Sequence, residues 1–599
     1  MACADRPFLV FSVAPLAVLF LVAPLAHTAS AASARQETPA ETPAETPDSL
    51  KWQGALQVGA ITLTLNFDIQ RDGQGNYGGA IYSVEQGNAK IPITGMEIDG
   101  DRVRVEASSV KASYAGTLSA DGEQVSGTWT QPGIAGELNL KRVDRFDSAR
   151  HVETWQGTMQ AGGNTFDFGL RVFRDEDGSW SAKLDSYSEN VEGLPAQLDR
   201  DGSKFNFSIP VTRAEYEGTL DESAGKISGL WKQAGGEFEL DFHKVALDAK
   251  PNLQRPQTPG DDVPYKQEPV RFDNPADQVS LAGTLTLPEG AGPWPAMVLI
   301  SGSGPQDRDE TLFSHKPFLV IADHLTRHGI AVLRYDDRGT AQSSGDFSTA
   351  TSEDFSRDAE AGMKYLQSRP DIRSDRIGFI GHSEGGMIAP MIAARNPQVA
   401  LIVLLAGPGV DGGQITLSQN RALNEVAGVP ADINQASEHL VKRLLEKVRE
   451  SDDPLADEFV DDVMAEASQL ISKVMENEDP AAALLNTRAG LARMNSPWYR
   501  YFIRFDPQTA LRQVQCPVLA LNGTKDLQVL VDLNIDAIQQ ALTEAGNTDF
   551  EVHKLENQNH LFQETAGTGS VLDYGRIEQT ISPVTLDLMT GWIKKRVDR

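Results

Sequence analysis

The chain has 599 residues, which is too many for a single hydrophobic core, so we expect two to four domains. Its formal net charge is −30 at pH 7, and phosphate binding needs clustered Lys and Arg, so the composition argues against a nucleic-acid partner. The only two cysteines are Cys3 and Cys516, which excludes a disulfide scaffold or a cysteine-based metal site, and we expect Cys516 to be a small buried apolar residue.

The first 34 residues have the pattern of a signal peptide. An apolar run at 8–25 follows Arg6, and the small-residue stretch HTASAASARQ behind it offers Ala-Ser-Ala cleavage sites. An uncleaved membrane anchor is the alternative. A Thr/Pro/Glu-rich spacer follows at 35–50. We therefore expect an exported protein, periplasmic or secreted, without a membrane span in its mature chain.

An internal repeat follows the spacer. One copy opens with WQG at Trp52 and the other with WQG at Trp155. The first copy continues to YAGTLSADGEQVSGTWTQ from Tyr114, and the second to YEGTLDESAGKISGLWKQ from Tyr216. The matching aromatic residues, glycines and turn acids indicate a duplication.

Each repeat alternates apolar and polar residues over short runs between Asp/Gly-rich turns, which is typical of antiparallel meanders. We predict two small β-barrels or sandwiches, at 51–145 and 152–247. The Asp-rich turns lack the ligand spacing of a calcium loop, so no metal is expected. The repeated tryptophans are either core residues or sugar-binding platforms, and their matching positions within strands favour the core: Trp52, Trp129, Trp155 and Trp231.

A Pro-rich linker at 248–268 precedes a region of different texture. From 269 to 599, wholly apolar strands such as PAMVLISG and VALIVLLAG alternate with amphipathic helices, which predicts a mostly parallel sheet covered on both faces. Between 412 and 506 the alternation stops and the pattern becomes helical. We interpret this segment as a lid inserted into the α/β domain.

A serine stands where one of these strands turns into a helix. The stretch RIGFIGHSEGGMIAP places Ser383 within Gly381–Gly385, which has the Gly-x-Ser-x-Gly spacing of a nucleophile elbow. Glycines suit the two outer positions because bulkier residues would clash with the crossing helix and strand. We predict that Ser383 is a catalytic nucleophile, with a structural turn serine as the alternative.

The general base and its acid partner should follow the serine in the order acid, then histidine. His439 lies in a helical stretch of the insert and His553 within a strand, whereas His560 follows that strand in ENQNHLF, at the edge where active-site groups gather. We therefore predict His560 as the base. Asp526, just after the strand CPVLALNG, is the predicted acid, and Asp532 is the second candidate.

The oxyanion of an acyl-transfer intermediate needs backbone donors. We expect one to be the N–H of Glu384, the residue after the nucleophile. The second should come from the loop that begins Gly302-Ser303-Gly304-Pro305, with Ser303 favoured and Gly302 as the alternative. A plain Gly/Ser turn without a catalytic role is the competing interpretation.

Five segments together carry a resemblance to a known superfamily: SGSGPQDRDE, RYDDRGTAQSSGDF, GHSEGG, LNGTKDLQV and QNHLFQ. Residues from about 270 to 599 resemble an α/β-hydrolase of the serine-aminopeptidase-like or dienelactone-hydrolase-like kind. The set is similar to that of bacterial carboxylesterases with an exported β-rich N-terminal region. The N-terminal repeats lie outside the resemblance.

The resemblance implies a triad of Ser383, Asp526 and His560. It also implies that Arg338 and Gly339 brace the loop after their strand, with a solvent-facing salt bridge as the other interpretation of Arg338. The chain departs from many relatives in one respect, since its loop begins Ser301-Gly302 where they have His-Gly. The second oxyanion donor is the position affected.

The function we expect is hydrolysis of small carboxylic esters through an acyl-enzyme, without a cofactor or metal. A peptidase or amidase with the same triad is the alternative enzyme, and a non-catalytic cell-envelope or polysaccharide-binding protein is the alternative of another class. The substrate-binding residues are not identified. An aromatic cluster at the end of the insert fits either an apolar acyl pocket or core packing: Trp498, Tyr499, Tyr501 and Phe502.

Overall fold

The computed structural model describes residues 49–598 apart from short segments at 59–60, 72–76, 84–88, 111, 132–133, 144–149, 162–163, 175–179, 188–190, 211, 213, 234–235, 248, 250–254, 452 and 475–480. The predicted signal peptide and nearly all of the predicted spacer lie outside the described residues. The chain divides into two compact units, with the boundary between residues 252 and 253.

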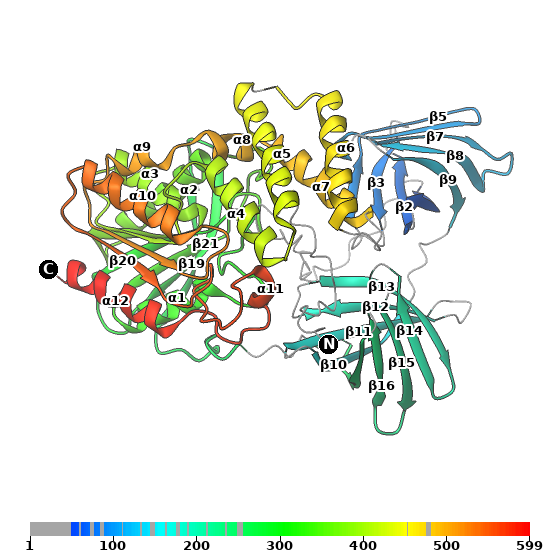
Figure 1. Cartoon of the computed structure of the whole chain (residues 1–599), viewed down its shortest axis with the longest axis horizontal. Coiled ribbons are helices and arrows are strands. Elements are labelled where there is room, and N and C mark those ends of the chain that lie inside the picture. Colours follow the sequence, from blue (N-terminus) through cyan, green and yellow to red (C-terminus); the bar gives the residue numbers. More distant parts are fainter. Residues whose placement is uncertain are drawn as a thin grey trace, which may run out of the picture. The chain divides into compact units, whose positions relative to one another are not determined.

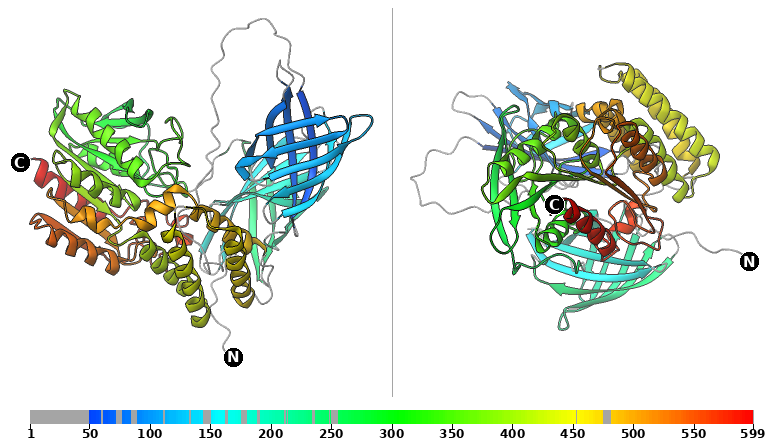
Figure 2. Two further views of the ribbon diagram at one scale, coloured as in Figure 1. Left: turned by 90° about the horizontal axis from the view of Figure 1, so that it is seen from above. Right: turned by 90° about the vertical axis from the view of Figure 1, so that its left-hand side faces the viewer.

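The first repeat forms one antiparallel sheet in the order β4-β3-β2-β1-β9-β8-β7-β6-β5, which curls into a barrel-like shape (Figure 2). Period-two alternation places one apolar face inside, as in β6, where buried and exposed residues alternate strictly. Its elements are β1 (Ser49–Val58), β2 (Ile61–Arg71), β3 (Tyr77–Ser83), β4 (Ala89–Ile93), β5 (Gly95–Asp99), β6 (Arg102–Ala107), the 3₁₀ helix η1 (Ser108–Val110), β7 (Ala112–Leu118), β8 (Gln124–Gln131) and β9 (Ile134–Arg142).

The second repeat is a closed eight-stranded barrel (Figure 1). In it β13 pairs with both β12 and β14, whereas the first repeat divides the equivalent strand at Thr94 into β4, which pairs with β3, and β5, which pairs with β6. The strands are β10 (Arg150–Ala161), β11 (Asn164–Arg174), β12 (Trp180–Ser186), β13 (Val191–Asp201), β14 (Lys204–Ile209), β15 (Ala214–Asp221), β16 (Lys226–Gln233) and β17 (Gly236–Val245). The prediction of two all-β, barrel-like repeats is confirmed.

Aromatic side chains fill both repeats. The core interpretation of the four tryptophans is confirmed, because each is at most 2% exposed: Trp52, Trp129, Trp155 and Trp231. Tyr114 lies in the first core and donates its hydroxyl to the carbonyls of Val125 and Leu138, while the equivalent Tyr216 donates to Leu240. These buried side chains are therefore packing residues and cannot serve as exposed sugar platforms.

The C-terminal unit is built on an eight-stranded sheet in the order β18-β19-β21-β20-β22-β23-β24-β25 (Figure 1). β19 pairs antiparallel with both its neighbours, and the other five pairings are parallel. The strands are β18 (Lys266–Asn274), β19 (Val279–Leu287), β20 (Trp294–Ile300), β21 (Ala331–Tyr335), β22 (Ile372–His382), β23 (Ile402–Leu405), β24 (Val518–Gly523) and β25 (Phe550–Leu555).

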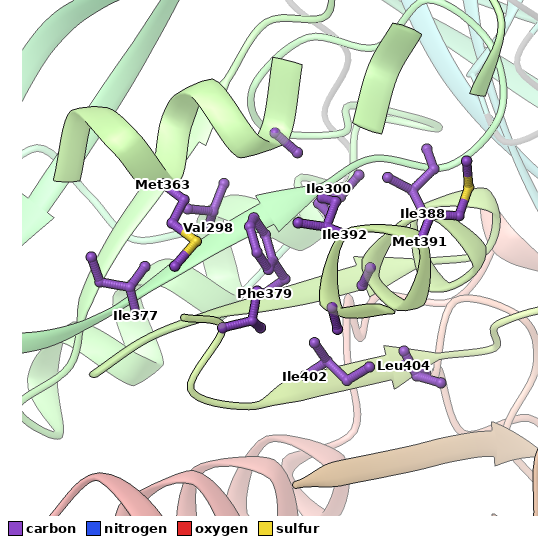
Figure 3. Close-up of a cluster of buried hydrophobic side chains, with 14 of the residues drawn as sticks. Val298, Ile300, Met363, Ile377, Phe379, Ile388, Met391, Ile392, Ile402 and Leu404 are labelled. Carbon is purple, nitrogen blue, oxygen red and sulfur yellow. The ribbon is translucent and has the colours of Figure 1, made fainter. Parts of the chain in front are cut away.

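Helices cover both faces of this sheet, since its central strands are buried on both sides. On one face, Met363 of α2 and Ile388, Met391 and Ile392 of α3 belong to the same buried cluster as Phe379 of β22 (Figure 3). The opposite face packs against α1 and α12. The helices outside the insertion are α1 (Pro317–Arg327), α2 (Ser352–Gln367), α3 (Glu384–Arg395), α9 (Pro507–Leu511), α10 (Val531–Glu544), α11 (Val571–Tyr574) and α12 (Pro583–Val597).

A helical insertion separates β23 from β24, and its apolar residues form a cluster that also includes Met387 of α3 and Val529. Its helices are α4 (Gly412–Val426), α5 (Ala431–Glu450), α6 (Asp457–Val474), α7 (Ala481–Met494) and α8 (Pro497–Arg504). Cys516, at the return to the sheet, was expected to be a small buried apolar residue; it is partly buried and packs against the core, and burial raises the pKa of its thiol to about 12. Among the described residues, no helix is both long and apolar enough to cross a membrane.

Candidate active site

Ser383 occupies a sharp turn between β22 and α3. β22 ends at His382, α3 begins at Glu384, and Ser383 between them has φ = 51° and ψ = −116°. A positive φ is strained for a residue with a Cβ, and such strain is concentrated at functional sites. The turn places the serine at the carboxyl end of a central parallel strand.

The two outer glycines of the elbow are required by steric contact with backbone. A Cβ on Gly381 would lie 2.0 Å from the carbonyl oxygen of Gly385, and a Cβ on Gly385 would lie 2.1 Å from the carbonyl oxygen of Ile300. Because backbone atoms cannot move aside as a flexible side chain does, neither position accepts even alanine without distorting the turn.

Replacement of Gly381 by alanine should lower the free energy of unfolding by about 3 kcal/mol through this overpacking. Gly591 in α12 is the matched control, because a Cβ there meets no atom within 4 Å. Gly591→Ala should raise stability by about 0.5–1 kcal/mol, the helix-propensity difference. Calorimetric unfolding of the full chain measures both changes, and an unchanged Tm for G381A would contradict the steric argument.

Asp526 and His560 meet at the carboxyl ends of β24 and β25. Nδ1 of His560 lies 2.8 Å from Oδ2 of Asp526, and both side chains are buried. The other carboxylate oxygen of Asp526 accepts the backbone N–H groups of Gln528 and Val529, at 2.8 and 2.9 Å. The carboxylate is thereby fixed in orientation and holds the imidazole with its proton on Nδ1.

The loop around His560 is held by a buried amide that the sequence analysis did not single out. Oδ1 of Asn559 accepts the N–H groups of Leu561 and Gln563, both at 3.0 Å. The loop that carries Asp526 packs closely against the His560 loop, since a Cβ on Gly523 would lie 2.1 Å from the carbonyl oxygen of Gln558. The only sequence signal for Asn559 was its position next to His560.

The second candidate for the acid, Asp532, and the two histidines passed over for the base lie elsewhere. Asp532 forms an exposed ion pair with Lys554 at 2.7 Å. His553 lies 3.4 Å from Glu551 at the surface of β25, and His439 is exposed on α5. Neither histidine has Asp526 as a partner.

The loop after β20 lies against Ser383. A Cβ built on Gly302 would be 3.3 Å from Cβ of Ser383. The N–H of Gly302 is donated to Oε1 of Glu310 at 2.8 Å, so it does not point at a substrate oxygen. Asp337 holds the two ends of the loop, because its oxygens accept the hydroxyl of Ser301 at 2.7 Å and the N–H of Gln306 at 2.9 Å.

His382 and Glu310 form a buried pair beside this loop, and sequence reasoning missed both. Nδ1 of His382 lies 2.9 Å from Oε1 of Glu310, and its Nε2 lies 3.1 Å from the backbone oxygen of His560. Burial alone would lower the pKa of His382, but the Glu310 carboxylate and the His560 carbonyl hold it above its ordinary value. The two residues are 72 positions apart, so no local pattern pairs them.

The side chain of Glu384, whose N–H is a predicted oxyanion donor, is buried between the elbow and the insertion. Its Oε1 accepts the hydroxyl of Ser352 at 2.6 Å and the indole N–H of Trp498 at 2.8 Å. Burial raises the pKa of Glu384, although hydrogen bonds from Ser352, Trp498 and Ser303 oppose the shift. The carboxyl group therefore favours its neutral form more than an ordinary glutamate does.

Arg338 is 6% exposed, so the solvent-facing salt bridge considered for it is wrong. Its Nε donates to Asp358 at 2.7 Å and its Nη2 to Asp277 at 2.7 Å. Gly339 follows at φ = 71° and donates its N–H to Ser344 at 2.9 Å. Both residues hold the chain that leaves β21.

The aromatic end of the insertion is mostly packed core. Trp498, Tyr499 and Phe502 are buried, and the rings of Trp498 and Phe502 stack with centroids 5.4 Å apart. Tyr501 instead lines a surface pocket of about 580 Å³, which contains none of the predicted triad residues and is lined by Thr351, Asn495, Pro497, Arg500, Tyr501, Arg504 and Phe505. Three of the four aromatic residues therefore fit the core interpretation.

Within the part of the chain that the structure describes, no group of three or more His, Cys, Asp or Glu side chains could hold a metal ion. In the same part, no hydrogen bond joins the Ser383 hydroxyl to the His560 ring. The His560 ring nevertheless lies beside the elbow, because its centroid is 4.9 Å from that of His382. The arrangement is a strained serine and a carboxylate-bound histidine at one edge of the sheet.

Comparison with known protein families gives a match to the C-terminal unit. The sequence model of the X-Pro dipeptidyl-peptidase (S15) family matches residues 277–560, which span every predicted catalytic residue. The N-terminal repeats lie outside this match.

Two curated proteins are similar in sequence. Esterase EstD of Thermotoga maritima is 28% identical over 362 residues, which cover 59% of this chain and 77% of EstD. The putative hydrolase YtaP of Bacillus subtilis is 32% identical over 148 residues, which cover 22% of this chain and 48% of YtaP. Among solved structures, the Pyrococcus furiosus esterase PF2001 is 15% identical with a TM-score of 0.35, and the match covers 58% of this chain and 98% of that one.

Proposed function

The C-terminal unit belongs to the α/β-hydrolase superfamily, and from that premise we propose that this hydrolase cleaves carboxylic esters through an acyl-enzyme formed on Ser383. The observation that carries the proposal is the buried Asp526–His560 pair. It follows two strands whose carboxyl ends share an edge of the sheet with the strained Ser383.

In this mechanism, Nε2 of His560 takes the proton of the Ser383 hydroxyl while Oγ attacks the ester carbonyl carbon. Asp526 keeps the other ring proton on Nδ1 and stabilises the imidazolium that forms. His560 then protonates the departing alcohol, and a water molecule hydrolyses the acyl-enzyme by the reverse sequence. The mechanism requires the Ser383–His560 hydrogen bond in the substrate complex, where such contacts tighten relative to the free enzyme.

The oxyanion of the tetrahedral intermediate is bound by the N–H groups of Glu384 and Ser303. Glu384 is the first residue of α3, so the helix dipole adds to the attraction of its N–H for negative charge. Ser303 is preferred to Gly302 as the second donor because the N–H of Gly302 is already donated to Glu310.

The environment of Glu384 supports an ester over a substrate that carries a free amine. An aminopeptidase needs a charged carboxylate to anchor the amino group of its substrate. Glu384 is the acidic residue next to the nucleophile in the chain, but it is buried and bound by Ser352 and Trp498, and its pKa is raised. The S15 match keeps a peptidase as the second candidate.

A substrate panel separates these two candidates. We expect short-chain p-nitrophenyl esters to be hydrolysed with far higher kcat/KM than X-Pro or aminoacyl anilides, measured under identical conditions. N-acetylation of the anilide tests for an amine anchor, and it should change the residual rate little. Preference for a free-amine anilide, abolished by acetylation, would favour the peptidase.

We also propose that the helical insertion is a lid over this site and that the protein is exported. The hydrogen bond from Trp498 of α8 to Glu384 supports the first proposal, because it joins the insertion to the residue after the nucleophile. The apolar leader of the sequence supports the second. N-terminal sequencing of protein recovered outside the cytoplasm tests the proposed cleavage.

A further inference from the structure

The pair of Glu310 and His382 touches all three segments of the proposed active site. Oε1 of Glu310 receives the N–H of Gly302 from the oxyanion loop and lies 2.9 Å from the ring of His382, which directly precedes Ser383. The other ring nitrogen of His382 contacts the backbone carbonyl of His560. A continuous chain of buried hydrogen bonds therefore joins the oxyanion loop, the nucleophile elbow and the catalytic histidine loop.

The hydrogen-bond pattern determines the charge of this ring. A carboxylate and a backbone carbonyl both only accept, so His382 satisfies the two contacts at once only when both of its nitrogens carry protons. In the described part of the chain, the second oxygen of Glu310 is buried without a hydrogen-bond partner. An imidazolium at His382 thus compensates a carboxylate that would otherwise be buried at high energetic cost.

We propose, on the basis of the function proposed above, that Glu310 and His382 are positioning residues whose ion pair clamps the oxyanion loop and the His560 loop around Ser383. The clamp is complete only while His382 is doubly protonated. Deprotonation removes one of its two donors and releases either Glu310 or the His560 carbonyl. The groups facing the ring are Glu310 from the oxyanion loop, His560 from the loop after β25 and Asp526 from the loop after β24.

Because the clamp depends on the protonation of His382, it predicts how kcat changes with pH. Because the pKa of His382 is raised, the clamp is intact below its ordinary value of about 6.5 and is lost as pH rises through the raised value. The kcat for ester hydrolysis should therefore decline on the alkaline side with a one-proton dependence. In Glu310→Gln the carboxylate no longer favours the imidazolium, so this decline should move to lower pH.

The test uses the full chain and two variants of the pair. Glu310→Gln should lower kcat about 10- to 100-fold with little change in KM, as expected when catalytic groups are slightly misplaced. His382→Asn, which cannot titrate, should lose the alkaline decline altogether. Glu551→Gln is the matched control, because it makes the same change at the exposed Glu551–His553 pair and should alter neither kcat nor the pH profile.

An activity-independent measurement separates this proposal from the proposed function. Nitrogen-15 NMR of the histidine rings, assigned with the His382→Asn variant, should show His382 more than half doubly protonated at about pH 6.5. A neutral ring at that pH would overturn the clamp, as would an alkaline decline that is unchanged in both variants of an active enzyme. If the wild-type chain had no esterase activity, the proposed function would be refuted. The protonation state of His382 would still test the clamp.

Discussion

Replacement of Ser383 by alanine is expected to reduce kcat/KM for p-nitrophenyl esters on the order of 10⁶-fold, because the acyl-enzyme can no longer form. The elbow itself should be unchanged, since alanine keeps the Cβ whose strain the surrounding glycines accommodate. The residual rate measures what the oxyanion donors and substrate binding contribute without a nucleophile. Steady-state kinetics with highly purified enzyme measures the loss.

Labelling with a fluorophosphonate probe tests the same prediction independently of the substrate chosen. It should label the wild-type chain at Ser383, as mapped by peptide mass spectrometry, and should leave S383A unlabelled. Ser472→Ala provides the control, because that serine lies exposed on α6 of the insertion. This variant should be labelled by the probe and should hydrolyse esters at the same rate as the wild type. Ester hydrolysis that survives in S383A would refute the assigned nucleophile.

Replacement of Asp526 by asparagine should reduce kcat on the order of 10⁴-fold without disturbing the fold. The asparagine oxygen can still accept the N–H groups of Gln528 and Val529. Its amide N–H₂ must then face Nδ1 of His560, which can accept only in the tautomer that carries its proton on Nε2. That tautomer cannot take a proton from Ser383, so the geometry survives while the base is disabled.

Asp532→Asn is the matched control for this prediction. It makes the same chemical change six residues later, at an acid whose side chain is 82% exposed and paired with Lys554. Surface pairs contribute at most about 1 kcal/mol, so kcat should remain near the wild-type value. If D532N lost activity and D526N retained it, the acid assignment would be reversed.

Local pattern and chain order supplied the candidate residues of the site. The strand, elbow and helix around Ser383 follow from apolar runs and glycine spacing, and chain order selected Asp526 and His560 from among several acids and histidines. These signals work because period, propensity and turn geometry are properties of neighbouring residues. The repeated WQG and YxGTL segments predicted the duplicated β-structure for the same reason.

Local pattern could not predict the contacts between loops that are distant in the sequence. The sequence gives no sign that Thr94 divides a strand which is continuous in the second repeat. It left the exposure of Arg338 open, and burial beside Asp358 decided it. The N–H of Gly302 is committed to Glu310 only because the loop folds back on itself.

What the sequence by itself determined is the kind of scaffold, an α/β unit behind two β-repeats, and which residues are the candidates for acyl transfer. Only the tertiary structure decided what surrounds them: the carboxylate that accepts from Gly302, the histidine that joins Glu310 to the His560 loop, and the tryptophan that reaches Glu384 from the insertion. The physical reason is that parallel strands bring the ends of remote segments to one edge, where contacts depend on loop paths and strand register rather than on local spacing.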